Sequence, residues 1–207
     1  MSKKHPVIAI TGSYGAGTST VKNAFNHIFG RVGAKPVVIE GDSFHKFDRK
    51  QMKTAMELED KKGNKYFSHF GPEANHFDLI EQTFKDYSEK GHCKRRYYIH
   101  TDEEGIPFGR KAGEFTEWED AGRDSDLLFY EGLHGGVKDG AIDVAKYIDL
   151  LIGVVPVVNL EWIQIDLQLP YRHPHTLLQH HIVHLDVEVH EANVQLVLLQ
   201  SYQMDVQ

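Results

Sequence analysis

The stretch that decides the fold of this chain is Val7-Ile-Ala-Ile-Thr-Gly-Ser-Tyr-Gly-Ala-Gly-Thr-Ser-Thr20. Its first four residues form a continuous apolar run, which is typical of a strand buried on both faces of a parallel sheet. A glycine-rich turn follows, and then a segment from about residue 18 to residue 29 with apolar residues at helical spacing. Strand, turn and helix in this order predict a loop whose main-chain N–H groups bind phosphate.

The glycine-rich turn supplies the predicted nucleotide-binding residues. They are Gly12, Ser13, Tyr14, Gly15, Ala16, Gly17, Thr18, Ser19 and Thr20. Small residues let N–H groups approach phosphate oxygens, and the Ser19 hydroxyl is suited to Mg²⁺. A general P-loop has a lysine where this chain has Thr18, so a cation must reach the γ-phosphate from elsewhere. The alternatives are a turn without a ligand and a dinucleotide fold, whose glycine spacing differs.

The remaining pattern alternates strands with helices. Strands are expected at 36–39, 97–100, 127–130 and 150–155, and helices at 49–61 and 73–88. This alternation predicts an α/β fold with a doubly wound, mostly parallel sheet. In such sheets the ligand crevice lies beyond the carboxyl ends of the strands.

Polar residues follow the second predicted strand. Asp42, His45 and Arg49 are spaced i, i+3, i+7, so a helix there would place them on one face. The carboxylate of Asp42 is predicted to take a hydroxyl proton, while His45 and Arg49 hold an anionic group of the acceptor. The alternative is a helix cap at Asp42 followed by a solvated, charged helix face.

Two further segments carry candidate site residues. Glu131 ends the buried strand Leu127-Leu-Phe-Tyr130, as a Walker B acid that holds Mg²⁺ would; alone, it could also end a plain turn. The cluster Lys94-Arg-Arg-Tyr-Tyr-Ile-His100 has two interpretations, a contact for a sugar phosphate or an exposed edge strand whose charges discourage aggregation.

Composition narrows the function classes. A formal net charge of −7 argues against a general nucleic-acid binder. A single cysteine, Cys93, excludes an intrachain disulfide and fits a reducing compartment. The N-terminus lacks a secretory signal and no apolar run is long enough to span a bilayer, so we expect a cytoplasmic protein without a membrane partner.

The composition changes abruptly after Gln164. All 18 glycines precede this point, whereas the last 43 residues contain six of the 14 histidines. We therefore expect a domain at 1–164 and a tail at 165–207 of different origin, such as a frameshift, rearrangement or fusion. Alternation at 183–190 and an apolar run at 194–199 predict a hairpin in this tail, with disorder as the alternative.

Five motifs together resemble bacterial phosphoribulokinases. They are Thr11-Gly-Ser-Tyr-Gly-Ala-Gly-Thr-Ser-Thr20, Glu40-Gly-Asp-Ser-Phe-His45, Ser68-His-Phe-Gly-Pro-Glu-Ala-Asn75, Phe129-Tyr-Glu-Gly-Leu-His-Gly135 and Val154-Val-Pro-Val-Val-Asn-Leu-Glu-Trp-Ile-Gln164. The resemblance runs to Gln164, within the wider phosphoribulokinase and uridine kinase group. It implies a sheet of the nucleoside-monophosphate-kinase type.

The resemblance also implies a reaction, the Mg²⁺-dependent transfer of the ATP γ-phosphoryl group to the 1-hydroxyl of ribulose 5-phosphate in carbon fixation. The roles that it implies are a base at Asp42, sugar-phosphate contacts at His45, Arg49, Tyr98 and His100, and metal-site groups at Ser19 and Glu131. It further implies a homo-oligomer and, at Arg31, control by NADH.

Two alternative functions stay open at this point. After Gln164, the segment Ile165-Asp-Leu-Gln-Leu-Pro170 replaces a stretch that carries lysine and arginine in the family. The chain could thus be a truncated nucleotide-binding protein with little or no kinase activity. A uridine-type nucleoside kinase is the other alternative, although Arg49 and His100 suit an anionic acceptor better.

Overall fold

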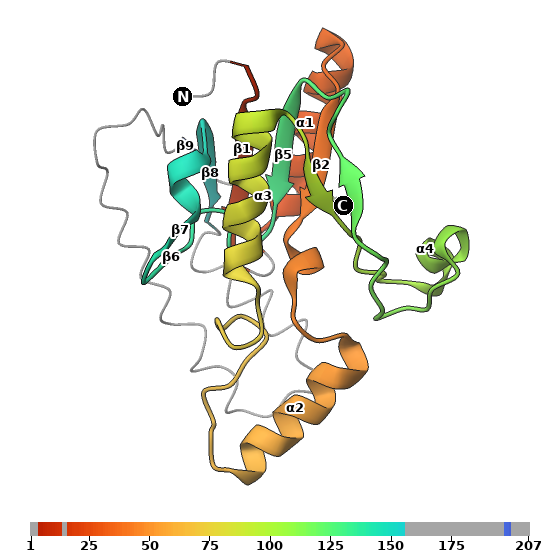
Figure 1. Ribbon diagram of the computed structural model, residues 1–207, viewed down its shortest axis with the longest axis vertical. Helices are drawn as coiled ribbons and strands as arrows, with labels where there is room; N and C mark the ends of the chain where they lie inside the picture. Colours follow the sequence, from red (N-terminus) through yellow and green to blue (C-terminus); the bar gives the residue numbers. More distant parts are fainter. Residues whose placement is uncertain (1–3, 14–15, 156–196, 200–207) are drawn as a thin grey trace, which may run out of the picture.

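A parallel sheet forms the centre of the computed structural model, which describes residues 4–13, 16–155 and 197–199 (Figure 1). Its strands are β1 (Val7–Gly12), β2 (Pro36–Glu40), β5 (Leu127–Glu131), β8 (Leu150–Val154) and β9 (Val197–Leu199). Their order is β2-β5-β1-β8-β9, and every neighbouring pair runs parallel. The predicted α/β fold with its mostly parallel sheet is confirmed.

The sheet buries both of its faces, as the apolar strand runs predict. Alternate residues of β1 point to opposite sides, so Val7 and Ala9 belong to one core cluster and Ile10 to another. Helix α3 (Phe77–Lys90) covers the first face, where Phe84 packs edge-on against Tyr130. Helix α1 (Thr18–Val32) covers the second face. Helices on both faces make this sheet doubly wound.

The segment after β2 does not form the one helix that would place Asp42, His45 and Arg49 on a common face. A 3-10 turn, η1 (Gly41–Phe44), carries Asp42 and ends at His45, whose backbone is extended. Helix α2 (Arg49–Lys61) begins only after Asp48, whose side chain accepts a hydrogen bond from the Gln51 N–H in a capping box. The expectation of one helical face was therefore wrong, because a cap starts a new helix at Arg49.

The strand expected at 97–100 was also wrong. Regular pairing is confined to β3 (Cys93–Arg95) and β4 (Glu119–Ala121), which form an antiparallel pair. Beyond Arg95, an isolated bridge joins Tyr98 to Phe115, and main-chain hydrogen bonds link Tyr97 and Ile99 to residues 113–116. The Tyr97 N–H donates instead to the Thr116 hydroxyl, so the pairing is interrupted and no regular strand forms.

The remaining elements are short. They are α4 (Asp102–Gly105), η2 (Ile106–Phe108), β6 (Lys138–Asp139), β7 (Ile142–Asp143) and η3 (Val144–Tyr147). Helix α3 starts four residues later than expected and ends at Lys90. Most of the predicted tail hairpin lies outside the described residues; its last part, β9, pairs with β8. In the described part of the chain, no helix has the length and apolarity needed to span a membrane.

Candidate phosphotransfer site

A cavity of about 880 Å³ lies beyond the carboxyl ends of β1, β2 and β5. Of the predicted site residues, those that line it are Gly12, Ser13, Gly17, Thr18, Ser19, Asp42, His45, Tyr98, His100 and Glu131. Ala16 is buried, Thr20 faces solvent, and Arg49 lies outside the lining; Tyr14 and Gly15 are outside the described residues. The fold thus brings the predicted phosphate loop and the predicted acceptor side to one cavity.

The phosphate loop leads from β1 into α1 with two glycines that the geometry requires. Gly17 has a φ of 94°, in the left-handed region that glycine enters without strain. A Cβ on Gly12 would lie 2.7 Å from the Val154 carbonyl oxygen and 2.9 Å from Thr18 Cγ2. The first residues of α1 line the cavity, where the partial positive charge of a helix N-terminus favours an anion.

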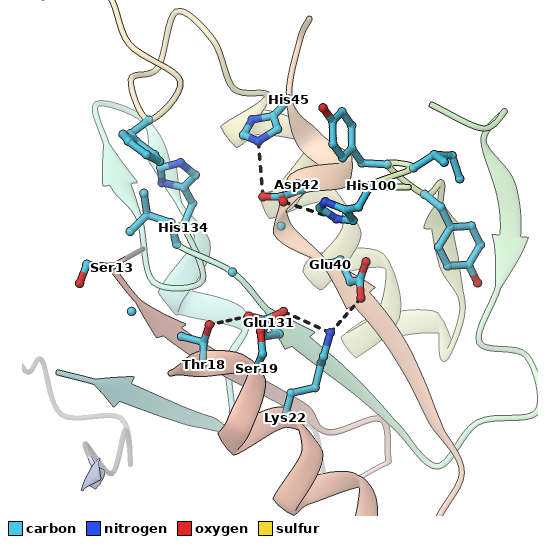
Figure 2. A pocket seen from close by; sticks show the side chains of 18 of the residues that line it. Ser13, Thr18, Ser19, Lys22, Glu40, Asp42, His45, His100, Glu131 and His134 are labelled. Atoms are coloured by element: carbon cyan, nitrogen blue, oxygen red, sulfur yellow. Dashed lines mark hydrogen bonds and ion pairs between the residues drawn. The ribbon is translucent and has the colours of Figure 1, made fainter. Parts of the chain in front are cut away.

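A cation that sequence reasoning missed lies on the next turn of α1. Lys22 Nζ lies 3.0 Å from Glu40 Oε1 and 3.5 Å from Glu131 Oε2 (Figure 2). Burial lowers the pKa of Lys22, but the hydrogen bond and charge of Glu40 and the charge of Glu131 outweigh it and leave the pKa above its ordinary value. A protonated lysine therefore lines the cavity although the P-loop lacks its own.

Glu131 is held at the cavity floor by two groups of α1. The Thr18 hydroxyl donates to Glu131 Oε1 at 2.6 Å, and Lys22 approaches the other carboxylate oxygen. The hydroxyl of Ser19 lines the same space. Among the described residues, no group of three or more His, Cys, Asp and Glu side chains could hold a metal ion. One carboxylate and one hydroxyl nevertheless fit Mg²⁺, which commonly completes its shell with water and substrate phosphates.

Asp42 faces the phosphate loop from the opposite side of the cavity, and histidines surround it (Figure 2). Its carboxylate oxygens lie 3.4 Å from His45 Nε2 and 3.7 Å from His100 Nε2. The hydrogen bond to His45, with the charges of His45, His100 and His134, lowers the pKa of Asp42 against the opposing effect of burial. Asp42 is therefore ionised near neutral pH and able to accept a proton.

His45 is oriented by Asn75. The amide nitrogen of Asn75 donates to the carbonyls of His69 and Gly71, which leaves its oxygen to accept from His45 Nδ1 at 2.7 Å. This bond points Nε2 of the ring toward Asp42. Sequence reasoning quoted Asn75 only within a motif and gave it no role.

The cluster at 94–100 divides between the two interpretations. Lys94 and Arg95 form ion pairs with Asp120 and Glu119 across the β3–β4 pair, as the edge-strand interpretation expects. Tyr98 and His100 instead line the cavity, 5.0 Å apart between ring centroids.

Arg49 borders these two rings. Its Nη2 donates to the His100 carbonyl at 3.3 Å, and its Cζ lies 6.0 Å from the Tyr98 ring centroid. The structure thus places Arg49 beside the cavity rather than in its lining.

Two other residues of the site, Glu40 and His134, were given no role from the sequence. Glu40 ends β2 directly beside Glu131 of β5 in the parallel register. His134 lines the cavity three residues after Glu131, with its ring 4.7 Å from the Phe77 ring. Burial, aided by the charge of His45, lowers the pKa of His134 to about 4, against the effect of Asp42. Both residues stand in the motifs quoted above. Their position at or shortly after the end of a predicted strand could have identified them as site residues.

A glycine-rich loop at a helix N-terminus, a strand-end carboxylate and a doubly wound sheet define a P-loop protein of the kinase type. The chain matches the Phosphoribulokinase / Uridine kinase family over residues 7–166. It therefore belongs to that family, and the resemblance inferred from the motifs is confirmed.

Individual relatives agree with this assignment. The chain is 56% identical over 164 residues to a chromosomal phosphoribulokinase of Cupriavidus necator and 52% identical over 164 residues to phosphoribulokinase 1 of Cereibacter sphaeroides. These matches cover 79% of this chain, and 56% and 57% of the relatives. The chain thus spans a little over half the length of the curated relatives that it matches.

Solved structures agree on the fold. A phosphoribulokinase from Rhodobacter spheroides superposes with a TM-score of 0.74 at 43% identity, over 86% of this chain and 63% of that one. A fructose transport system kinase from Silicibacter superposes with a TM-score of 0.56 at 17% identity, over 86% of this chain and 79% of that one. The second similarity shows the fold alone.

Proposed function

We propose that this chain, through the domain at 1–164, carries the site that transfers the γ-phosphoryl group of ATP to the 1-hydroxyl of ribulose 5-phosphate. The observation that carries the proposal is the pairing across one cavity of the phosphate loop and Lys22 with the Asp42–His45–His100 group. Relatives more than half identical over 164 residues bear the name phosphoribulokinase.

Each side of the cavity has its own task in the proposed reaction. The N–H groups of the loop and the ammonium of Lys22 bind and orient the phosphates of ATP. The carboxylate of Asp42 takes the proton of the acceptor hydroxyl as that oxygen attacks phosphorus, and the bond to the leaving ADP oxygen breaks. Mg²⁺ beside Ser19 and Glu131 would supply charge neutralisation at the transferring group.

The acceptor side is suited to an anionic sugar. His45 and His100 present ring nitrogens to the cavity, Tyr98 a ring beside them, and Arg49 a guanidinium at the border. Cationic and hydrogen-bonding groups of this kind bind a phosphate ester, whereas a neutral nucleoside would leave their charges without a partner. We therefore place the sugar phosphate ahead of uridine.

A second candidate function is nucleotide binding with little or no turnover. It is favoured by the length of the match, which ends near residue 166 and covers 56% of the chromosomal Cupriavidus necator relative. One arginine-type contact to the transferring group is worth about 10³ to 10⁵ in rate. A chain without the family's segment after Gln164 would then bind ATP through the loop and transfer phosphate slowly. Homo-oligomer formation, control by NADH through Arg31 and a cytoplasmic location stay predictions from the resemblance.

The test combines calorimetry with a turnover assay on the full chain. ATP with Mg²⁺ should bind, and ribulose 5-phosphate should be phosphorylated in preference to uridine. Replacing Asp42 by Asn should lower turnover by about 10²- to 10⁴-fold with little change in ATP affinity, because a base acts on the acceptor and not on the nucleotide. Unchanged turnover would exclude Asp42 as the base, and ATP binding without any turnover in the parent would favour the second candidate.

A further inference from the structure

Arg96 is half-buried beside the acceptor side of the cavity and has an unusual set of contacts. Its Cζ lies 3.8 Å from the Phe115 ring centroid and 4.8 Å from the Trp118 ring centroid. Its Nε donates to the Ser43 carbonyl and its Nη2 to the His45 carbonyl, both at 2.7 Å. Within the described residues, no carboxylate lies within 4.0 Å of this guanidinium.

Burying a cation without a carboxylate is costly. Burial lowers the pKa of Arg96 to about 10, against the opposing charge of Glu117. Two kinds of contact offset this cost. The guanidinium donates hydrogen bonds to two carbonyls, and two aromatic faces pack against it. A lysine could not reproduce the contact, because an ammonium has no planar fork.

The two carbonyls belong to the short segment that carries the proposed base. Asp42 immediately precedes Ser43, and His45 holds the Asp42 carboxylate. The carbonyl between them, that of Phe44, accepts from the His76 N–H at 2.9 Å. Three successive carbonyl oxygens therefore accept hydrogen bonds, two of them from Arg96.

The rest of the segment is equally constrained. Ser43 and Phe44 are fully buried, and the Phe44 ring packs 5.8 Å from that of Trp118, which also contacts Arg96. The side chains of Asp42 and His45 are the ones that point to the cavity. The orientation of these two groups thus depends on where the backbone between them is held.

We propose that Arg96 is a positioning residue that fixes the backbone at 43–45, so that Asp42 and His45 are held in register with the acceptor. This role deepens the proposed function and rests on it, because Arg96 touches neither the cavity nor the phosphate loop. It predicts that loss of the guanidinium weakens the binding of the sugar phosphate and leaves the binding of ATP unchanged.

The test compares Arg96→Lys and Arg96→Ala with Arg95→Lys. The control arginine is the preceding residue in the chain, but it lies in β3 and is bonded to Glu119 of β4. Circular dichroism and thermal unfolding first establish that each variant folds. Calorimetry then measures the affinity for ribulose 5-phosphate and for ATP with Mg²⁺.

Both Arg96 variants should bind the sugar phosphate on the order of 10- to 100-fold more weakly, as small misplacements of site groups cost. Their ATP affinity should stay within about 3-fold of the parent, a difference under 1 kcal/mol. Guanidinium ion at non-denaturing concentration should restore acceptor binding to Arg96→Ala, since it can occupy the vacated space between the rings. Arg95→Lys should behave as the parent.

A readout that needs no substrate separates this inference from the proposed function. The imidazole NMR signal of His45, assigned with His45→Gln, should move in Arg96→Lys and stay in place in Arg95→Lys. If the parent binds no sugar phosphate, the proposed function fails while this signal still tests the positioning. An unmoved His45 signal, or an equal loss of ATP and sugar-phosphate affinity, would overturn the role of Arg96.

Discussion

His134 should make the fold lose stability as the pH falls from about 6.5 to about 4. Its ring lies against Phe77, and burial lowers its pKa from 6.5 to about 4. Above pH 6.5 the histidine is neutral in both states and has no effect. Below pH 6.5 the histidine binds a proton in the unfolded chain but stays neutral in the folded chain. The free energy of unfolding therefore falls until the pH reaches the pKa of the folded state.

The size of the effect follows from the pKa difference between the two states. A difference of about 2.5 units at about 1.4 kcal/mol per unit gives roughly 3 kcal/mol as an upper limit. Domains are stable by only about 5 to 15 kcal/mol, so this is a large fraction. Asp42 does not interfere, because its lowered pKa confines its own loss of stability to pH values below its ordinary 3.8.

Urea denaturation at pH 7.5 and at pH 4.5 measures the effect in the parent and in His134→Gln. The variant should lose less stability between the two pH values, by up to about 3 kcal/mol. Phe84→Leu is the control, since it weakens the same core without removing a titrating group. It should lower stability equally at both pH values. Equal pH dependence in the parent and His134→Gln would refute the assignment of a half-buried imidazole that stays neutral.

Three other perturbations test the site and the core. Gly41→Ala should destabilise by about 1 to 3 kcal/mol, because its Cβ would lie 2.7 Å from the Tyr130 hydroxyl oxygen; a melting temperature equal to that of the parent would contradict this. Cys93 is 2% exposed and burial raises its pKa to about 12, so a thiol reagent at pH 8 should modify it only after unfolding. Lys22→Met should weaken ATP binding by about 1.5 to 3 kcal/mol, the range for hydrogen bonds to charged groups; calorimetry with matched Mg²⁺ would reveal an unchanged affinity and so exclude Lys22 as a phosphate contact.

The strands and the phosphate loop could be predicted because their signals are local. Apolar runs at 7–10, 36–39 and 127–130 are long enough to mark buried strands, and each is a strand of the central sheet. The helix at 49–61 was predicted with its observed bounds. The prediction of a strand at 97–100 failed because the main-chain pairing there is irregular: it forms an isolated bridge, and a side-chain hydroxyl takes the Tyr97 N–H. Its apolar and aromatic residues gave no sign of this.

By itself, the sequence determined the chemistry available at the carboxyl edge of the sheet: a glycine loop, a carboxylate at the end of a buried strand, and Asp42 after another. Only the tertiary structure decided their partners. Lys22 meets Glu131 across 109 positions, and Arg96 meets the backbone beside Asp42 across more than 50. Such contacts depend on the parallel register and on the packing of a helix and a loop against the sheet, and neither leaves a periodic trace in the sequence.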